Sequence, residues 1–292
     1  MFPKDLAQLC VFYAITPLHA GSGQATGAVD LPIQRERHTA WPQVQASGVK
    51  GAFRDWFYRY YLANGTGGED KKKQAVQLTE RVFGREEGGE GGAGQAGAVA
   101  VTDARLLAFP VRSSVAPFVW VTCPAVLTRL ARDLALTPGA PAVPVMSLPD
   151  NENYLSVQGN LSTPIVLEDL AVSPLANPPD ATALQKVFSG LAPQVERLLL
   201  ISDQNFSFLV RTATEVQPQI KIDIDTGITV DGSLRYQELL PADTVLYSLV
   251  FFAPERVADQ SELLLAQVIR DHFLKAISTH IQMGGDMTLG RG

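Results

Sequence analysis

The sequence has few cysteines and no long apolar run. Cys10 and Cys123 are the only cysteines in 292 residues, and both stand in apolar, strand-like segments, which indicates buried free thiols rather than a disulfide framework. No uncharged apolar stretch reaches the roughly eighteen residues of a transmembrane helix. Residues 1–5 do not begin a signal peptide. We therefore expect a cytoplasmic protein with no membrane partner.

Several signatures of small-molecule chemistry are also missing. There is no Walker A lysine motif, no histidine or cysteine pair with zinc spacing, and no G-x-S-x-G elbow. The glycines of residues 21–27 do not have the G-x-G-x-x-G spacing of a dinucleotide site. Residues 223–227 begin like a calcium loop, but the glycine comes one position early and no closing glutamate follows. A charged hairpin face is the simpler interpretation of that run.

Positive charge is scarce overall but concentrated in one window. The chain has 24 lysines and arginines against 30 acidic residues, a net charge of −6, which alone argues against nucleic acid. Residues 34–59 differ, because five basic residues (Arg35, Arg37, Lys50, Arg54 and Arg59) face two acidic ones (Glu36 and Asp55), five minus two giving +3. A local basic face on an acidic body is typical of a subunit that binds a polyanion on one side and protein on others.

Two glycine-rich runs lie at opposite ends of the chain. Residues 18–39 combine His19, Asp30 and arginines with Gly21, Ser22 and Gly23. Residues 284–292 read GGDMTLGRG. Glycine lets a backbone approach a ligand closely, and arginine binds phosphate with a planar fork. Together the runs predict a surface that holds a phosphodiester backbone, with Asp30 and His19 as residues able to move protons.

The hydrophobic pattern predicts an α+β protein. Residues 8–16 read as a buried strand, 47–62 as a helix that Ser47 caps, 219–236 as a β-hairpin and 260–282 as the longest helix. Residues 64–98 read as a flexible glycine- and glutamate-rich insertion. This order is compatible with a ferredoxin-like βαββαβ core, the arrangement of RRM domains, with large insertions.

Several blocks resemble a known family. LHAGSG at 18–23, GAVDLPIQRERHT at 27–39, SGVKGAFR at 47–54, IDIDTG at 222–227 and the terminal glycine run occur in the same order. They are similar to the RAMP proteins of CRISPR systems, and most of all to the backbone subunits of type III-B Cmr effector complexes. The matching blocks run from residue 18 to residue 292, which implies a single RAMP domain over residues 1–292.

The resemblance implies a function. Such subunits form a filament of identical copies along a crRNA guide, together with other subunits of the Cmr effector complex, and each has a ferredoxin-like palm and a hairpin thumb. The thumb kinks the guide–target duplex. The complementary single-stranded target RNA is then cut at regular intervals with a divalent metal, Mg²⁺ or Mn²⁺, leaving a 2′,3′-cyclic phosphate and a 5′-hydroxyl. The protein would thus be a metal-dependent endoribonuclease, active in the assembled complex.

The resemblance also distributes roles among residues. Asp30 matches the family's required acid and would take the 2′ proton or hold the metal, and His19 would assist the leaving 5′-oxygen. Tyr236 and Glu238 lie in a block where relatives carry secondary active-site residues. Further candidates would contact RNA: Gly21, Ser22, Gly23, Arg35, Arg37, Lys50, Arg54, Lys221, Arg235, Gly284, Gly285, Thr288 and Gly290.

Three other functions stay open at the level of sequence. A non-catalytic crRNA-binding scaffold would share the fold and differ in making no cleavage products. A small-molecule enzyme would use residues 18–39 for a nucleotide and need no guide RNA. A purely structural protein would assemble without any RNA.

Overall fold

The computed structural model describes residues 6–65, 68, 70–87, 94–256, 263–277 and 280–292. Its helices are α1 (Ala46–Asn64), α2 (Asp70–Phe83), α3 (Pro124–Leu134), α4 (Thr182–Leu191), α5 (Asp203–Thr212), α6 (Ala266–Ala276) and the short 3₁₀ helix η2 (Met287–Leu289). Its strands are β1 (Ala7–Tyr13), β2 (Gln43–Val44), β3 (Gly84–Arg85), β4 (Gln95–Ala96), β5 (Val99–Val101), β6 (Ala104–Arg112), β7 (Phe118–Thr122), β8 (Asn153–Ser156), β9 (Ile165–Leu167), β10 (Leu170–Pro174), β11 (Leu198–Leu200), β12 (Glu215–Gln219), β13 (Arg235–Leu239) and β14 (Val245–Phe252).

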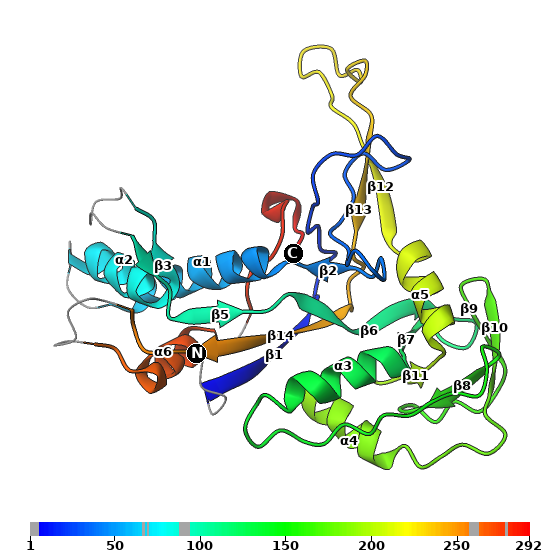
Figure 1. Cartoon of the computed structure of the whole chain (residues 1–292). Coiled ribbons are helices and arrows are strands. Elements are labelled where there is room, and N and C mark those ends of the chain that lie inside the picture. The colour runs from blue at the N-terminus through cyan, green and yellow to red at the C-terminus, as the bar shows by residue number, and fades with distance from the viewer. Residues whose placement is uncertain (1–5, 66–67, 69, 88–93, 257–262, 278–279) are drawn as a thin grey trace.

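A large mixed sheet forms the body. Its strand order is β1-β14-β6-β7-β11-β8-β10-β9, with β2 also paired to β6 and β5 to β14. β11 runs parallel to β7 and β10 parallel to β8, whereas each neighbouring pair in the series β1-β14-β6-β7 is antiparallel. Figure 1 shows α1, α2 and α6 toward one end of this sheet and α3 and α4 toward the other. The expected α+β architecture is confirmed.

Helix α1 forms because its apolar residues recur at helical spacing. Val49, Phe53 and Phe57 are fully buried, and the Phe53 ring packs edge-on against Phe273 of α6 with centroids 5.0 Å apart. The helix begins one residue before the expected Ser47 cap, and Gln45 at the N-cap position makes no side-chain cap bond. Asp103, from the loop before β6, accepts the Ala46 amide at 2.8 Å instead, so a distant residue caps this helix.

The expected flexible insertion at 64–98 contains an ordered helix. α2 buries Ala75, Thr79, Val82 and Phe83 against the body, and Arg81 forms a salt bridge with Glu255 at 2.7 Å. β3 and β4 then pair with each other. The prediction was wrong for this segment because its glycines flank a run with helical apolar spacing rather than interrupt it. Residues 66–67, 69 and 88–93 of the same range lie outside the described residues.

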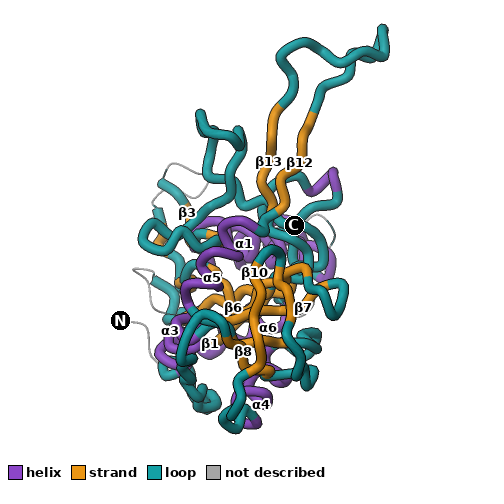
Figure 2. Tube along the Cα trace, turned by 90° about the vertical axis from the view of Figure 1, so that its right-hand side faces the viewer, coloured by secondary structure: helices purple, strands orange, loops and turns teal. Residues whose placement is uncertain are grey.

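A long hairpin projects from the body (Figures 1 and 2). β12 and β13 pair antiparallel from Glu215 opposite Leu239 to Gln219 opposite Arg235. The ladder therefore lies mostly outside the predicted range 219–236, and the intervening residues form turns with one isolated bridge, Ile222 to Thr229. Ile224 is 98% exposed, because the tip has no second layer on which to bury an apolar face.

Two further features complete the fold. α6 spans Ala266–Ala276 and is shorter than the helix expected at 260–282, part of which (260–262 and 278–279) lies outside the described residues. No helix in the described part of the chain is long and apolar enough to span a membrane.

Candidate functional site

The loop that carries Asp30 runs along the free edge of β13, at the base of the hairpin. The Leu31 amide donates to the Tyr236 carbonyl at 3.0 Å, and the Glu238 amide donates to the Leu31 carbonyl at 3.0 Å. The Asp30 carboxylate extends this ladder, because its Oδ2 accepts the Tyr236 amide at 2.7 Å. Oδ1 makes no hydrogen bond to any described residue, and Asp30 is partly exposed. The Tyr236 amide therefore fixes the carboxylate through one oxygen and leaves the other without a hydrogen bond from the described residues.

His19 is fixed to the same strand edge. Its Nδ1 lies 2.7 Å from the Glu238 carbonyl oxygen. A carbonyl oxygen only accepts, so Nδ1 carries the proton and Nε2 presents a lone pair when the ring is neutral. Tyr236 and Glu238 are two residues apart in a strand, a spacing of roughly 7 Å. Asp30 and His19 are thus anchored on neighbouring main-chain groups of one strand.

The C-terminal glycine run packs against His19. The Gly285 amide donates to the His19 carbonyl at 2.9 Å. Gly284 has φ of +81°, and a Cβ there would lie 2.6 Å from the same carbonyl oxygen, so the approach requires glycine. The structure brings together the two glycine-rich runs, which are more than 240 residues apart in the sequence.

The Glu238 carboxylate is hydrogen-bonded to other groups of the protein. It is 7% exposed and accepts the Ile33 amide at 3.0 Å, the Thr214 hydroxyl at 2.8 Å and the guanidinium of Arg35. Arg35 also donates to the carbonyls of Ala40 and Val210. In this structure the Glu238 carboxylate and the Arg35 guanidinium are engaged with each other in a largely buried ion pair, so a direct role for either side chain in catalysis or RNA binding stays a prediction that would require this pair to open. The main-chain atoms of Glu238 still anchor His19.

Tyr236 contributes its backbone. Its amide holds Asp30 and its carbonyl accepts the Leu31 amide, while the side chain is 40% exposed. The structure thus brings Asp30, His19, Tyr236 and Glu238 together along one strand edge. The main chain of Tyr236 and Glu238 holds the side chains of Asp30 and His19 there.

The RNA-binding candidates form two groups. One surrounds the hairpin and the glycine runs, where these residues are exposed: Gly21, Ser22, Gly23, Arg37, Lys221, Arg235, Gly284, Gly285, Thr288 and Gly290. Some of them are partly engaged, since Arg235 donates to Gln219 at 3.0 Å and Ser22 to the Pro32 carbonyl at 3.1 Å.

The other group lies on α1. Arg54 is exposed and donates to the Gly84 carbonyl at 2.9 Å. Burial, followed by the charges of Arg54 and Arg256, lowers the pKa of Lys50. Lys50 and Arg54 are four residues apart on α1, so the two candidates present positive charge on the same flank of the helix.

No protein-only metal site accompanies Asp30. Among the described residues, no group of three or more histidine, cysteine, aspartate or glutamate side chains is arranged to hold an ion. Asp30 offers one carboxylate oxygen without a hydrogen bond to a described residue, and one such oxygen does not make a resident metal cage. Magnesium commonly uses one or two carboxylates with phosphate and water oxygens, so a metal here would need ligands from RNA.

Sequence reasoning missed a polar cluster beside this site. Arg291, in the C-terminal run, donates to Gln217 of β12 and Gln237 of β13, and also pairs with Asp286. The one sequence signal was an arginine inside a glycine run, which gives no indication of its partners.

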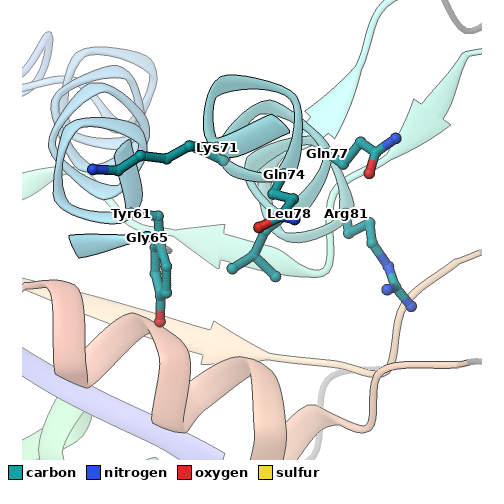
Figure 3. Close-up of a pocket in the computed structure, with 8 residues that line it drawn as sticks. Tyr61, Gly65, Lys71, Gln74, Gln77, Leu78 and Arg81 are labelled. Atoms are coloured by element: carbon teal, nitrogen blue, oxygen red, sulfur yellow. The ribbon is translucent and has the colours of Figure 1, made fainter. Parts of the chain in front are cut away.

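A cavity lies apart from the hairpin base. It has a volume of about 320 Å³ and lies between α1 and α2, lined by Tyr61, Gly65, Lys71, Gln74, Ala75, Gln77, Leu78 and Arg81. Figure 3 shows the Tyr61 hydroxyl directed toward α6, where it meets His272 Nδ1 at 2.6 Å. The cationic groups are occupied, since Lys71 donates to the Ala63 carbonyl and Arg81 to Glu255. This cavity includes no residue of the 18–39 run, so it does not support a nucleotide enzyme built on that run.

The fold and the site together define an α+β protein in which two glycine-rich runs enclose the base of a projecting hairpin. The model of the RAMP superfamily matches residues 11–292, and the chain belongs to that superfamily. A curated relative, the CRISPR system Cmr endoribonuclease Cmr4 of Pyrococcus furiosus, is 32% identical over 299 residues, which cover 98% of this chain and 93% of the relative.

Solved structures agree with this assignment. A crystal structure of oligomeric Cmr4 from Pyrococcus furiosus matches with a TM-score of 0.70 at 25% identity, over 99% of this chain and 95% of that one. A cryo-EM structure of the type III-B Cmr-beta complex bound to cognate target RNA includes a chain with a TM-score of 0.70 at 21% identity, over 98% of this chain and 94% of that one. At that identity the second likeness concerns the fold alone.

Proposed function

We propose that this chain is a crRNA-bound backbone subunit of a type III-B effector complex and cleaves complementary single-stranded RNA. The relative it matches almost end to end is a Cmr endoribonuclease, and related structures are oligomeric or bound to target RNA. The proposed partners are the guide, the target, further copies of this chain and other subunits of the complex. Its place of action would be the cytoplasm.

The observation that carries the proposal is the attachment of Asp30 and His19 to one edge of β13. Both side chains sit at the base of a hairpin that projects away from the body (Figure 2). A strand of RNA deformed by the hairpin would pass this base. The site is therefore suited to a reaction in which the protein positions RNA and moves protons, without supplying a nucleophile of its own.

The proposed reaction is transesterification within the RNA. The 2′-oxygen attacks the adjacent phosphorus, the bond from phosphorus to the 5′-oxygen breaks, and a 2′,3′-cyclic phosphate and a 5′-hydroxyl result. The Asp30 carboxylate takes the 2′ proton, and the imidazolium of His19 gives a proton from Nε2 to the departing 5′-oxygen. The Glu238 carbonyl accepts from Nδ1, which leaves Nε2 as the ring nitrogen available for this transfer. In-line placement of the 2′-oxygen supplies much of the acceleration.

A divalent metal remains part of the proposal as a requirement of the assembled complex. We infer that Asp30 would hold Mg²⁺ or Mn²⁺ together with RNA phosphate oxygens, because magnesium commonly uses one or two carboxylates with phosphate and water oxygens. The ion's contribution when bound would be to neutralise charge on the phosphate.

We also propose that β1, α1, β6, β14 and α6 are the counterparts of the first five elements of a ferredoxin-like palm, β-α-β-β-α. The strand order β1-β14-β6 is the order that such a palm has for its first, third and second strands. The hairpin from β12 to β13 would be the thumb. Its exposed isoleucines, Ile222, Ile224 and Ile228, are suited to wedging between bases.

The test is the Asp30→Asn variant in an assembled complex with guide RNA. Asparagine keeps an oxygen that accepts the Tyr236 amide, so assembly and target binding should stay at wild-type levels. Cleavage of a labelled complementary RNA should fall about a hundred- to ten-thousand-fold. The assay compares product ends in magnesium and in chelator. Cleavage at the normal rate by the variant complex would refute the role of Asp30, and wild-type complexes that bind but never cut would favour the scaffold.

A further inference from the structure

Arg291 links the C-terminal glycine run to both strands of the hairpin. Its Nη2 donates to Gln217 Oε1 of β12 at 2.7 Å, and its Nη1 donates to Gln237 Oε1 of β13 at 2.5 Å. Nη1 also lies 3.2 Å from Asp286 Oδ2, and the Gln237 amide nitrogen donates to that same oxygen at 2.6 Å. The Arg291 side chain is 12% exposed and Gln237 is 2% exposed. One guanidinium group therefore bonds to side chains of both hairpin strands and to the Asp286 carboxylate.

The C-terminal run is itself fixed to the body. The Gly285 amide donates to the His19 carbonyl at 2.9 Å, and the Gly292 amide donates to the Pro17 carbonyl at 3.0 Å. The Arg291 carbonyl accepts from the Gln282 side chain at 2.5 Å. The run thus forms a bracket between the His19 segment and the base of the hairpin.

The C-terminal run contacts β13 next to the residue that binds Asp30. Gln237 is the neighbour of Tyr236, whose amide holds the Asp30 carboxylate at 2.7 Å. A shift of β13 relative to the body would move this amide, and the carboxylate with it. The planar, forked geometry of arginine suits such a link, because its two Nη atoms can bond two partners at once, whereas a lysine ammonium is a single point on a flexible stem.

We propose that Arg291 is a positioning residue for the cleavage reaction, holding the hairpin base in register with the segment that carries His19 so that Asp30 and His19 address the same phosphate. This inference rests on the proposed function. Arg291 touches no reacting atom in this scheme and acts through Gln217, Gln237 and the β13 backbone.

The experiment uses assembled complexes that carry Arg291→Lys, Arg291→Met or Gln217→Ala. Lysine keeps the charge beside Asp286 but cannot bridge both glutamines, and Gln217→Ala removes only the β12 arm. The matched control is Arg112→Met, which removes an exposed arginine from a pair with Glu168 at the end of β6. Each complex is assayed for kcat and KM with a complementary RNA, and for hydrogen exchange of the Tyr236 amide.

We expect Arg291→Met to lower kcat roughly 10- to 100-fold, as small misplacements of reacting groups do, with KM little changed. The Tyr236 amide should exchange faster in the same variant. Arg291→Lys and Gln217→Ala should give intermediate values of kcat and of the exchange rate, and Arg112→Met should match the wild type.

Three results would overturn the inference. In the first, kcat is normal although the Tyr236 amide exchanges faster. In the second, kcat falls although exchange is unchanged, which would place Arg291 in direct contact with RNA. In the third, KM rises while kcat stays constant. If Arg291→Met does not fold, the kcat values and Tyr236 amide exchange rates of Arg291→Lys and Gln217→Ala test the inference in its place. A wild-type complex that cuts nothing would instead refute the proposed function, since the reaction itself would be absent.

Discussion

Replacing Glu238 separates a structural role from a catalytic one. The carboxylate accepts three bonds, from Arg35, Thr214 and the Ile33 amide, in a place where only 9% of the Glu238 side chain is exposed. Glu238→Ala would leave the Arg35 guanidinium, itself 21% exposed, without its charge partner. Breaking such a buried pair from one side costs about 3–5 kcal/mol. At about 2–4 °C per kcal/mol, the melting temperature should fall by roughly 6–20 °C.

The Glu238→Gln variant should lose less stability than Glu238→Ala. The amide oxygen can still accept the Ile33 amide, but it offers no charge to Arg35, so a loss of about 1–3 kcal/mol is expected. The measurement is thermal and urea unfolding of the isolated chain, with Glu152→Ala as a control at an exposed glutamate. A double-mutant cycle with Arg35→Gln isolates the pair and should give a coupling of about 0.5–3 kcal/mol.

Melting temperature and cleavage together distinguish the two roles of the Glu238 carboxylate. If Glu238→Ala melts within about 1 °C of the wild type, a small shift on this scale, while assembled complexes lose cleavage, the carboxylate acts in the reaction and our structural assignment is wrong. If instead stability falls and the residual folded complexes cleave normally, the ion pair is a fold element only.

Two further predictions concern backbone geometry and pH. Gly284→Ala should lower the melting temperature and impair cleavage more than Gly290→Ala, because both positions have positive φ but only the Cβ at 284 meets a main-chain oxygen, that of His19; equal effects in the two variants would contradict the close approach. Burial, and then Lys275, lowers the pKa of His272. The unfolded chain therefore binds a proton below about pH 6.5 that the folded chain refuses, and stability falls as pH drops through that value. His272→Asn should reduce this acid loss in melting curves recorded between about pH 5 and 8, and an unchanged pH profile would contradict the assignment.

The sequence singled out the two candidate side chains at the hairpin base better than the groups that hold them. Asp30 and His19 stood out because acid, base and glycine occur together in one run, and the structure places both on one strand edge. The pairing of Arg35 with Glu238 spans more than 200 residues. Residue type indicates that each can form an ion pair, but only the tertiary fold decides the partner.

The same reasoning accounts for the errors in the fold. The alternating isoleucines at 220–224 predicted a sheet face, but a strand needs a neighbour to bury one side, and the hairpin tip has none. α2 was overlooked because its flanking glycines outweighed the helical spacing of Ala75, Thr79 and Val82. The local sequence pattern therefore predicted helices and strands correctly where tertiary packing favours the same structure. It gave the wrong structure where tertiary packing favours another one.

The isolated tip of the hairpin has a practical consequence. Between Val216 and Gln237 the only trypsin sites follow Lys221 and Arg235, and Lys221 is exposed beyond the end of the β12–β13 ladder. Proteolytic nicking after Lys221 would cut the chain once while the ladder keeps both fragments joined. In a nicked subunit the body would keep all its contacts and only the hairpin tip would be cut. Such a subunit would show whether filament growth and distortion of the bound duplex depend on the same part of the chain.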